Sequence, residues 1–317
     1  METAEFIWTN GEFVKWEDAK VHVLTHALHY GSAVFEGIRA YETDRGPAIF
    51  RHIDHLERLE RSASLFHIDM PFGLEELRQA THELIVRNKL NSCYIRPIVY
   101  RGYGEMGLFP LNVPVEVAIA VWPWGAYLGE DGQRSGIRAK VSSWRRLNSA
   151  SLIPQAKAAG QYLNSILAKV ETAHAGYEEA ILLDEHDNVC EGTGENLFIV
   201  RDGRLITPPP TASILDGITR RSVIEIARDH EWEVVERDLA RAELYQADEV
   251  FLTGTAAEIV PIREIDDRQI GPPGEVTLAI QSCYFDAVRG RVGRYVKWLD
   301  YVQQPEAVSA PVAELPQ

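Results

Sequence analysis

The stretch at residues 122–135 constrains the fold of this chain more than any other. It reads WPWGAYLGEDGQRS, is rich in glycine and aromatic residues, and has neither the period of a helix nor that of a strand. Such a stretch is typical of a mobile loop that joins two domains. We therefore predict a small N-terminal domain at residues 1–121, an inter-domain loop at 122–135 and a larger domain at 136–303.

Short β-rich runs alternate with amphipathic helical segments on both sides of this loop, which predicts an α+β (mixed α/β) protein. Asn10-Gly11 is a strong turn signal between two β-rich runs at the start of the chain. Apolar residues at helical spacing predict helices at residues 52–66, 74–90, 161–176, 217–230 and 275–290. Residues 304–317 contain three prolines and no periodicity, and we expect a disordered tail.

The charge balance limits the partners that this chain can have. Lys and Arg number 32 against 47 Asp and Glu, a formal net charge of −15, whereas nucleic-acid binding depends on clustered basic residues. No run approaches the roughly 18 apolar residues of a membrane span, and the first residues are too polar for a signal peptide. Cys93, Cys190 and Cys283 are few and far apart, which suggests free thiols. We expect a cytoplasmic protein with neither a nucleic-acid nor a membrane partner.

Two motif-like patterns are better explained as ordinary structure. The sequence GYGEMG at residues 102–107 matches the glycine spacing of a dinucleotide site, but two prolines follow where that site requires a helix. His22, His26 and His29 have no cysteine or paired carboxylate nearby to complete a tetrahedral metal site. We therefore expect a turn, packing histidines and no metal.

Lys157 is the only charged residue between Arg146 and Lys169. Its neighbours are alanine and glycine, so we expect it to be partly buried. Burial disfavours the ammonium form and can lower a lysine pKa from its usual value of about 10.4. A neutral lysine is a nucleophile suited to Schiff-base chemistry. The alternative is a charged lysine at the start of a helix, whose ammonium stays in water while its aliphatic stem covers apolar surface. The sequence around Lys157 fits both interpretations equally well.

Two further segments favour the nucleophile. Gly217, Ile218 and Thr219 begin a predicted amphipathic helix, where free N–H groups and the helix dipole form an anion site. A predicted strand ends in the sequence TGTA at residues 253–256, which offers hydroxyls and open amides at one turn. A reactive lysine with a phosphate site indicates pyridoxal 5′-phosphate. Its pyridine nitrogen needs a carboxylate, which either Glu191 or Glu195 could supply.

Seven segments resemble the branched-chain amino-acid aminotransferases, which are class IV, fold-type IV pyridoxal-phosphate enzymes. In chain order they are YGSAVFEGIRAYE, YIRP, PWGAYLG, IPQAKAAGQYLNS, EGTGENLF, LDGITR and LTGTAAEI. The resemblance runs from about residue 6 to 302. It implies a small N-terminal α/β domain and a larger C-terminal pseudo-barrel domain.

The resemblance implies roles for the cofactor-binding residues. Lys157 would form the Schiff base and then carry the proton between the substrate Cα and the cofactor C4′. Tyr162 would hydrogen-bond O3′, and Glu191 rather than Glu195 would pair with the pyridine nitrogen. The phosphate and ring would be held by Arg58, Leu215, Gly217, Ile218, Thr219, Gly254 and Thr255. Asp216, just before the phosphate turn, would either face away or cap the helix.

The substrate site implied by the resemblance must accept both a branched aliphatic side chain and glutamate. Its residues would be Tyr30, Phe35, Gly37, Tyr94, Arg96, Trp124, Tyr127, Thr255, Ala256 and Ala257. Arg96 would bind the distal carboxylate of glutamate, and the substrate α-carboxylate would lie on the Thr255–Ala256 amides. The inter-domain loop would order over bound substrate. Tyr30 would come from the other subunit, so we expect a homodimer or a higher oligomer such as a hexamer.

The implied activity is reversible transamination of L-leucine, L-isoleucine and L-valine with 2-oxoglutarate, giving the branched-chain 2-oxo acids and L-glutamate. The cofactor would alternate between the pyridoxal and pyridoxamine 5′-phosphate forms. The rival functions within the fold are a D-amino-acid or (R)-amine transaminase and an aminodeoxychorismate-type lyase. A protein that binds the cofactor without turnover is the third alternative, and the set of Lys157, Tyr162 and Glu191 argues against it.

Overall fold

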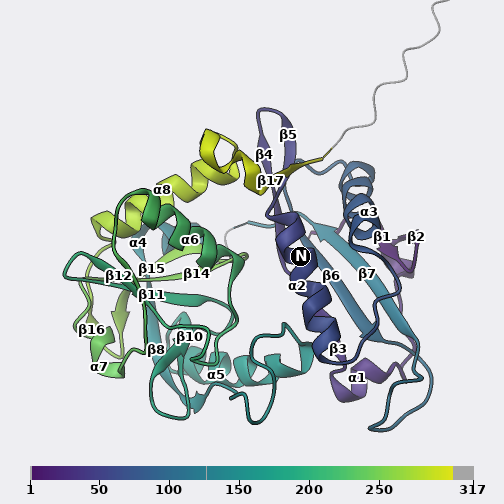
Figure 1. The fold of residues 1–317 in the computed structure, drawn as a ribbon, viewed down its shortest axis with the longest axis horizontal. Helices are drawn as coiled ribbons and strands as arrows, with labels where there is room; N and C mark the ends of the chain where they lie inside the picture. Colours follow the sequence, from purple (N-terminus) through teal and green to yellow (C-terminus); the bar gives the residue numbers. More distant parts are fainter. Residues whose placement is uncertain (1, 126, 303–317) are drawn as a thin grey trace, which may run out of the picture.

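Two β-sheets form the framework of the protein. The computed structural model describes residues 2–125 and 127–302, so the tail expected at 304–317 lies outside the described residues. In Figure 1 the first sheet and its helices lie on the right and the second sheet lies on the left. Helices accompany each of the two sheets, as the predicted α+β class requires.

The first sheet has eight strands in the order β17-β5-β4-β6-β7-β1-β2, with β3 paired to β6. The strands are β1 (Phe6–Thr9), β2 (Glu12–Lys15), β3 (Ala33–Phe35), β4 (Ile38–Thr43), β5 (Gly46–Phe50), β6 (Cys93–Arg101), β7 (Val115–Trp122) and β17 (Leu299–Tyr301). A short 3-10 helix, η1 (Trp16–Asp18), follows β2, and the helices are α1 (His26–Tyr30), α2 (His52–Leu65) and α3 (Leu74–Arg87). The hairpin at Asn10-Gly11 is confirmed, since both residues have positive φ, of 49° and 93°.

The second sheet has nine strands, and six of them close into a ring. The order is β10-β9-β8-β15-β14-β11-β12-β13, and β10 also pairs with β11, which closes the ring and gives the expected pseudo-barrel. The strands are β8 (Ile137–Arg145), β9 (Glu179–Leu183), β10 (Val189–Glu191), β11 (Asn196–Arg201), β12 (Arg204–Thr207), β13 (Val234–Glu236), β14 (Glu249–Gly254), β15 (Glu258–Ile265) and β16 (Arg268–Gln269). The helices are η2 (Ala159–Gln161), α5 (Tyr162–His174), α6 (Ile218–Asp229), α7 (Arg241–Leu244), α8 (Glu275–Val288) and η3 (Gly293–Trp298).

The two sheets share one hydrophobic cluster. Tyr41, Ala48 and Phe50 from the first sheet pack with Phe198 and Phe251 from the second, together with side chains of α6 and α8. Burying large apolar side chains of this kind stabilises a fold by about 1.5–3 kcal/mol each. The two halves of the protein are therefore packed against each other through a shared core.

Two segments differ from the simple division expected from the sequence. The expected loop at 122–135 contains a short helix, α4 (Glu130–Ser135), and its first residue ends β7. Strand β17, within the range expected for the larger domain, pairs with β5 of the first sheet. Both elements are six residues or shorter, too short for a periodic signal. Within the described residues, no helix is both long and apolar enough to span a membrane.

Candidate active site

A cavity of about 340 Å³ lies between the two sheets. Both halves contribute to its wall, α2 and β6 from the first, and β10, α6 and the end of β14 from the second. Of the residues expected at the site, it is lined by Phe35, Gly37, Arg58, Tyr94, Arg96, Trp124, Tyr127, Lys157, Tyr162, Glu191, Leu215, Gly217, Ile218, Thr219, Gly254, Thr255 and Ala256. The structure thus brings together residues from eight separate segments of the sequence.

Lys157 is half-buried and projects into this cavity just before α5. Its Nζ donates a hydrogen bond to the Tyr162 hydroxyl at 2.8 Å. Both of its backbone groups are tied to the first half, because its N–H donates to Ser62 Oγ at 3.1 Å and its carbonyl accepts from Phe35 N–H at 3.0 Å. The side chain of Phe35 forms a wall 5.3 Å from Nζ. Lys157 is therefore fixed in place at its backbone and at its amine.

The first turn of α6 offers open N–H groups to the cavity. Gly217 is its N-cap and supplies no side-chain cap, and a Cβ there would collide with the amide oxygen of Asn196. Asn196 also donates to the carbonyl of Leu215 at 2.8 Å, which fixes the chain before the turn. The amides of Ile218 and Thr219 therefore stay free for an anion.

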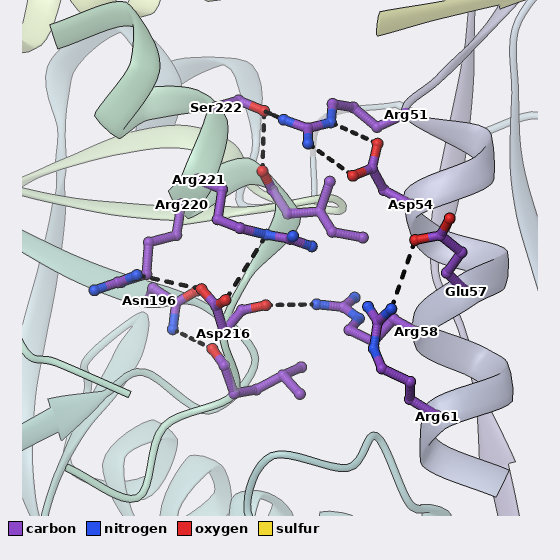
Figure 2. A network of polar contacts seen from close by, with 12 residues as sticks. Arg51, Asp54, Glu57, Arg58, Arg61, Asn196, Asp216, Arg220, Arg221 and Ser222 are labelled. Atoms are coloured by element: carbon purple, nitrogen blue, oxygen red, sulfur yellow. Dashed lines mark hydrogen bonds and ion pairs between the residues drawn. The ribbon is translucent and has the colours of Figure 1, made fainter. Parts of the chain in front are cut away.

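The carboxylate of Asp216 faces away from this turn. Figure 2 shows it directed toward Arg220 and Arg221, with contacts of 3.2 and 3.8 Å. It neither caps α6 nor lines the cavity. Of the two alternatives left open by the sequence, facing away is the correct one.

Arg58 reaches the same turn from α2, and a carboxylate that the sequence analysis missed holds it there. Its Nε and Nη2 donate to the two oxygens of Glu36 at 2.6 and 2.9 Å, and its Nη1 donates to the carbonyl of Asp216 at 3.1 Å (Figure 2). Although burial opposes ionisation, Arg58 and His55 hold the pKa of Glu36 well below its usual range. A guanidinium has five N–H donors, so Arg58 keeps two for an anion.

Glu191 also lines the cavity, as a buried carboxylate with three partners. Arg146 Nε is 2.8 Å from Oε1, and Oε2 accepts from Asn196 Nδ2 and from the N–H of Leu215, each at 3.1 Å. Burial raises the pKa of Glu191, while Arg146 and these donors favour its ionised form. Arg146 is a second site residue that the sequence analysis missed, since it precedes Glu191 by 45 positions.

Glu195 lines the cavity as well, but in different surroundings. Burial and the neighbouring Glu179 raise the pKa of Glu195 to about 8. Among the described residues, its carboxylate accepts a hydrogen bond from Gly194 N–H at 3.0 Å. Glu179 has its own partners in Lys169 and Thr193. Glu191 faces a cation, whereas Glu195 faces a like charge.

Aromatic side chains and one arginine form the outer part of the cavity. Arg96 lies 4.7 Å from the ring centroid of Phe35, and its Nη2 donates to the Tyr94 hydroxyl at 3.1 Å. Within the described part of the chain Arg96 has no carboxylate partner, and its Nε is buried without an acceptor. Trp124 stacks on Tyr127 with centroids 6.3 Å apart. This region can accept an apolar group and still offer a cation.

Gly37 lies directly against Tyr94. A Cβ at this position would collide with the Tyr94 hydroxyl and with the ring carbon that carries it. Only glycine therefore lets this ring stand at the cavity wall.

Tyr30 and Ala257 do not line the cavity of their own chain. Tyr30, on α1, is 44% exposed, and Ala257 is buried in the core of the second sheet. His52, His82 and Asp300 form the one group with metal-ligand spacing among the described residues. Arg78 donates to both oxygens of Asp300, so this group is already neutralised and we assign no metal to it.

Together the ring of strands, the lysine and tyrosine, the open helix end and the buried carboxylate define a fold-type IV pyridoxal-phosphate enzyme. The chain matches the family described as amino-transferase class IV over residues 33–265 and belongs to it. It is 47% identical over 304 residues to the branched-chain-amino-acid aminotransferase of Escherichia coli (strain K12), and the match covers 95% of this chain and 98% of that protein.

Solved structures give the same relationship. The branched-chain amino acid aminotransferase of T.th., complexed with 4-methylvaleric acid, has a TM-score of 0.90 at 48% identity. The same enzyme complexed with N-(5′-phosphopyridoxyl)-L-glutamate has a TM-score of 0.91 at 49% identity. Each comparison covers 96% of this chain and the whole of the solved one.

Proposed function

We infer that this protein catalyses reversible transamination of L-leucine, L-isoleucine and L-valine with 2-oxoglutarate, using pyridoxal 5′-phosphate. The observation that carries this conclusion is the arrangement of one cavity. Its inner part has an amine, an anion cradle and a buried carboxylate, and its outer part has aromatic walls and Arg96, which has no carboxylate partner among the described residues. The relatives are named for the same reaction, and one of them binds both a branched aliphatic acid and a glutamate adduct.

The residues of the inner cavity fit the cofactor. The free amides of α6, the two spare donors of Arg58 and the hydroxyl of Thr255 suit a phosphate dianion, and Glu191 suits the pyridine nitrogen. When bound, pyridoxal phosphate supplies the aldehyde that takes up the amino group and the ring that withdraws electrons. Lys157 holds the cofactor and moves the proton at the substrate Cα, and the Tyr162 hydroxyl orients its amine.

The outer cavity supports recognition of two unlike substrates. The rings of Phe35, Trp124 and Tyr127 form apolar walls for a branched side chain. Arg96 stands among them and pairs with the distal carboxylate of glutamate. Loop residues 122–135, between the two proposed domains, carry part of this wall and order over the substrate.

The assembly is a homodimer or a larger oligomer. Tyr30 of the partner subunit completes the substrate site. Large apolar side chains stand exposed on α1 and in the β6–β7 loop, and a second set stands on α5, as expected of surfaces that a second copy covers. All three cysteines are free, which suits the reducing cytoplasm.

The two lysines of the cavity give a matched test of the nucleophile. Lys157→Ala removes the amine that holds the cofactor, so the visible absorbance band of the bound cofactor disappears and turnover falls by at least about three orders of magnitude. Lys169→Ala, which lies in the same cavity but pairs with Glu179, keeps the band. A Lys157→Ala protein that retains the band and transaminates L-leucine at the wild-type rate would refute this role.

A further inference from the structure

The turn between β14 and β15 is anchored to other segments by the buried side chain of Glu258. Residues 253–256 bring the Thr255 and Ala256 amides to the cavity, and β15 begins two residues later at Glu258. Glu258 has φ of 61°, a left-handed conformation that is unfavourable for any residue with a Cβ. A strained backbone conformation of this kind persists only where the surrounding structure holds it. At Glu258 the surrounding residues hold the side-chain carboxylate.

Two hydrogen-bond donors and one guanidinium, from β4 and α4, converge on the carboxylate of Glu258, a residue that is only 5% exposed. Tyr41 of β4 donates to Oε1 at 2.9 Å, and Gln133 of α4 donates to Oε2 at 2.7 Å. The Arg39 guanidinium lies 3.3 Å from Oε2. The carboxylate therefore ties the turn to the first sheet and to the helix at the end of the inter-domain loop.

Arg39 extends this connection to the loop itself. Its second nitrogen, Nη2, donates to the backbone carbonyl of Trp124 at 3.4 Å. The indole of Trp124 packs against the ring of Tyr94 at 5.2 Å, and both rings line the cavity. The Arg39 guanidinium thus connects Trp124, a loop residue in the cavity wall, to the carboxylate of Glu258.

We propose that Arg39 and Glu258 are a positioning pair for substrate recognition, which sets the Thr255–Ala256 amides and the Trp124 wall at a fixed separation. The inference rests on the proposed placement of the substrate α-carboxylate on those amides. Neither side chain lines the cavity, so the pair acts through the groups that it holds. Because every amino acid presents the same α-carboxylate, the pair affects all of them alike, in contrast to Arg96.

The physical basis is the mutual dependence of two buried charges. Removing one partner leaves the other unpaired in a site with little water, and the structure relaxes to relieve it. The relaxation would move the turn or the loop, and a displacement of about 1 Å in a substrate-positioning element can cost on the order of a hundredfold in catalytic efficiency. Thr255 is one cofactor contact in this turn, but the contacts at α6, Arg58 and Glu191 involve neither Arg39 nor Glu258, and they keep the cofactor bound.

The test uses the holoenzyme with Glu258→Gln and Arg39→Met, measured separately with L-leucine and L-glutamate. The expected result is a rise in KM of about tenfold or more for both amino acids, by the same factor within about twofold, with the visible cofactor band unchanged. The double variant should be no worse than the more affected single variant, since the two residues act as one unit.

Glu264→Gln is the matched control. Glu264 lies on the same strand, β15, and pairs with Arg138 at 2.8 Å, but it is far from the turn along the strand. Its KM values should equal those of the wild type. If Glu258→Gln folds poorly, Arg39→Lys provides the second measurement, because one ammonium can keep the ion pair but not also the Trp124 carbonyl, so a smaller and equal rise in both KM values is expected.

Unchanged KM values in Glu258→Gln and Arg39→Met, a loss confined to L-glutamate, or a loss of the cofactor band would each overturn the proposal. These outcomes differ from a failure of the proposed function. If the proposed function were wrong, the wild-type enzyme would itself fail to transaminate L-leucine and L-glutamate.

Discussion

At the scale of single residues, Glu191 and Glu195 show how surroundings separate two chemically identical groups. Both line the cavity and both are buried, and their sequence positions alone do not distinguish them. Glu191 has Arg146 and two N–H donors, which favour a carboxylate, whereas Glu195 has Glu179 as its neighbour, which favours a carboxylic acid. The pyridine nitrogen of the cofactor requires a carboxylate, and the surroundings of Glu191 favour that form.

The raised pKa of Glu195 predicts a pH-dependent cost in stability. Its ordinary pKa is 4.5 and its folded-state pKa is about 8, so between these values the unfolded chain has released the proton and the folded chain has not. The free energy of unfolding therefore falls as pH rises through this window, by at most about 1.4 kcal/mol per pH unit. Glu195→Gln should remove this slope and be the more stable protein at pH 8–9.

Denaturant unfolding between pH 5 and 9 measures this difference, with the exposed Glu57→Gln as control. The Glu195→Gln and wild-type curves should converge toward pH 4.5. A stability difference that is constant across this range would show that Glu195 titrates normally.

At the scale of elements, the sequence predicted the helices and the turn that have a local pattern. It missed short elements that are stabilised by residues distant in the sequence. The Asn10-Gly11 hairpin and the helices α2, α3, α5, α6 and α8 appear where turn chemistry and periodicity placed them. The helix α4 and strand β17 were missed, because each is short and is stabilised by residues far along the chain, as Asp300 of β17 is by Arg78.

The same distinction holds for the site. The pattern around Lys157 and the start of α6 could be read from neighbouring residues, whereas the roles of Arg58 and Glu191 came from family resemblance. Glu36 and Arg146 gave no signal of their own, since their partners lie 22 and 45 positions away.

The contact between α1 and η2 predicts an intolerant glycine. Gly31 ends α1 with φ of 66°, and a Cβ there would lie 2.8 Å from the Cα of Gly160. Gly31→Ala should lower the free energy of unfolding by about 1–3 kcal/mol, from backbone strain and overpacking together. Gly46→Ala is the control, because Gly46 has φ of 93° but no atom within 4 Å of its Cβ position. Equal losses in denaturant unfolding would mean that the contact contributes nothing.

At the scale of the whole molecule, the exposed apolar surface indicates assembly. Leu28 of α1 and Leu108 and Phe109 of the β6–β7 loop are 61, 90 and 75% exposed. An isolated bridge between Thr25 and Tyr103 holds these two segments side by side, at the lower right of Figure 1. Leaving a patch of this kind in water is unfavourable, and a second copy of the chain would cover it.

Substituting this patch tests the proposed assembly. Leu108→Asp combined with Phe109→Asp should reduce the mass measured by light scattering to that of a single chain, and it should reduce turnover by separating Tyr30 of the partner subunit from the site. Leu65→Asp, an exposed leucine at the end of α2, should change neither. An unchanged oligomer in the double variant would place the interface elsewhere.

The central claim, that one cavity recognises both branched-chain amino acids and glutamate through L-specific transamination, is tested most directly by single half-reactions. The purified holoenzyme is mixed separately with L-leucine, L-glutamate, D-alanine and an (R)-arylalkylamine, and the loss of the visible cofactor band is followed. L-leucine and L-glutamate alone should bleach it, and Arg96→Ala should slow L-glutamate at least about tenfold more than L-leucine. Rapid bleaching by D-alanine or the amine, or equal losses for both L-amino acids in Arg96→Ala, would contradict the claim.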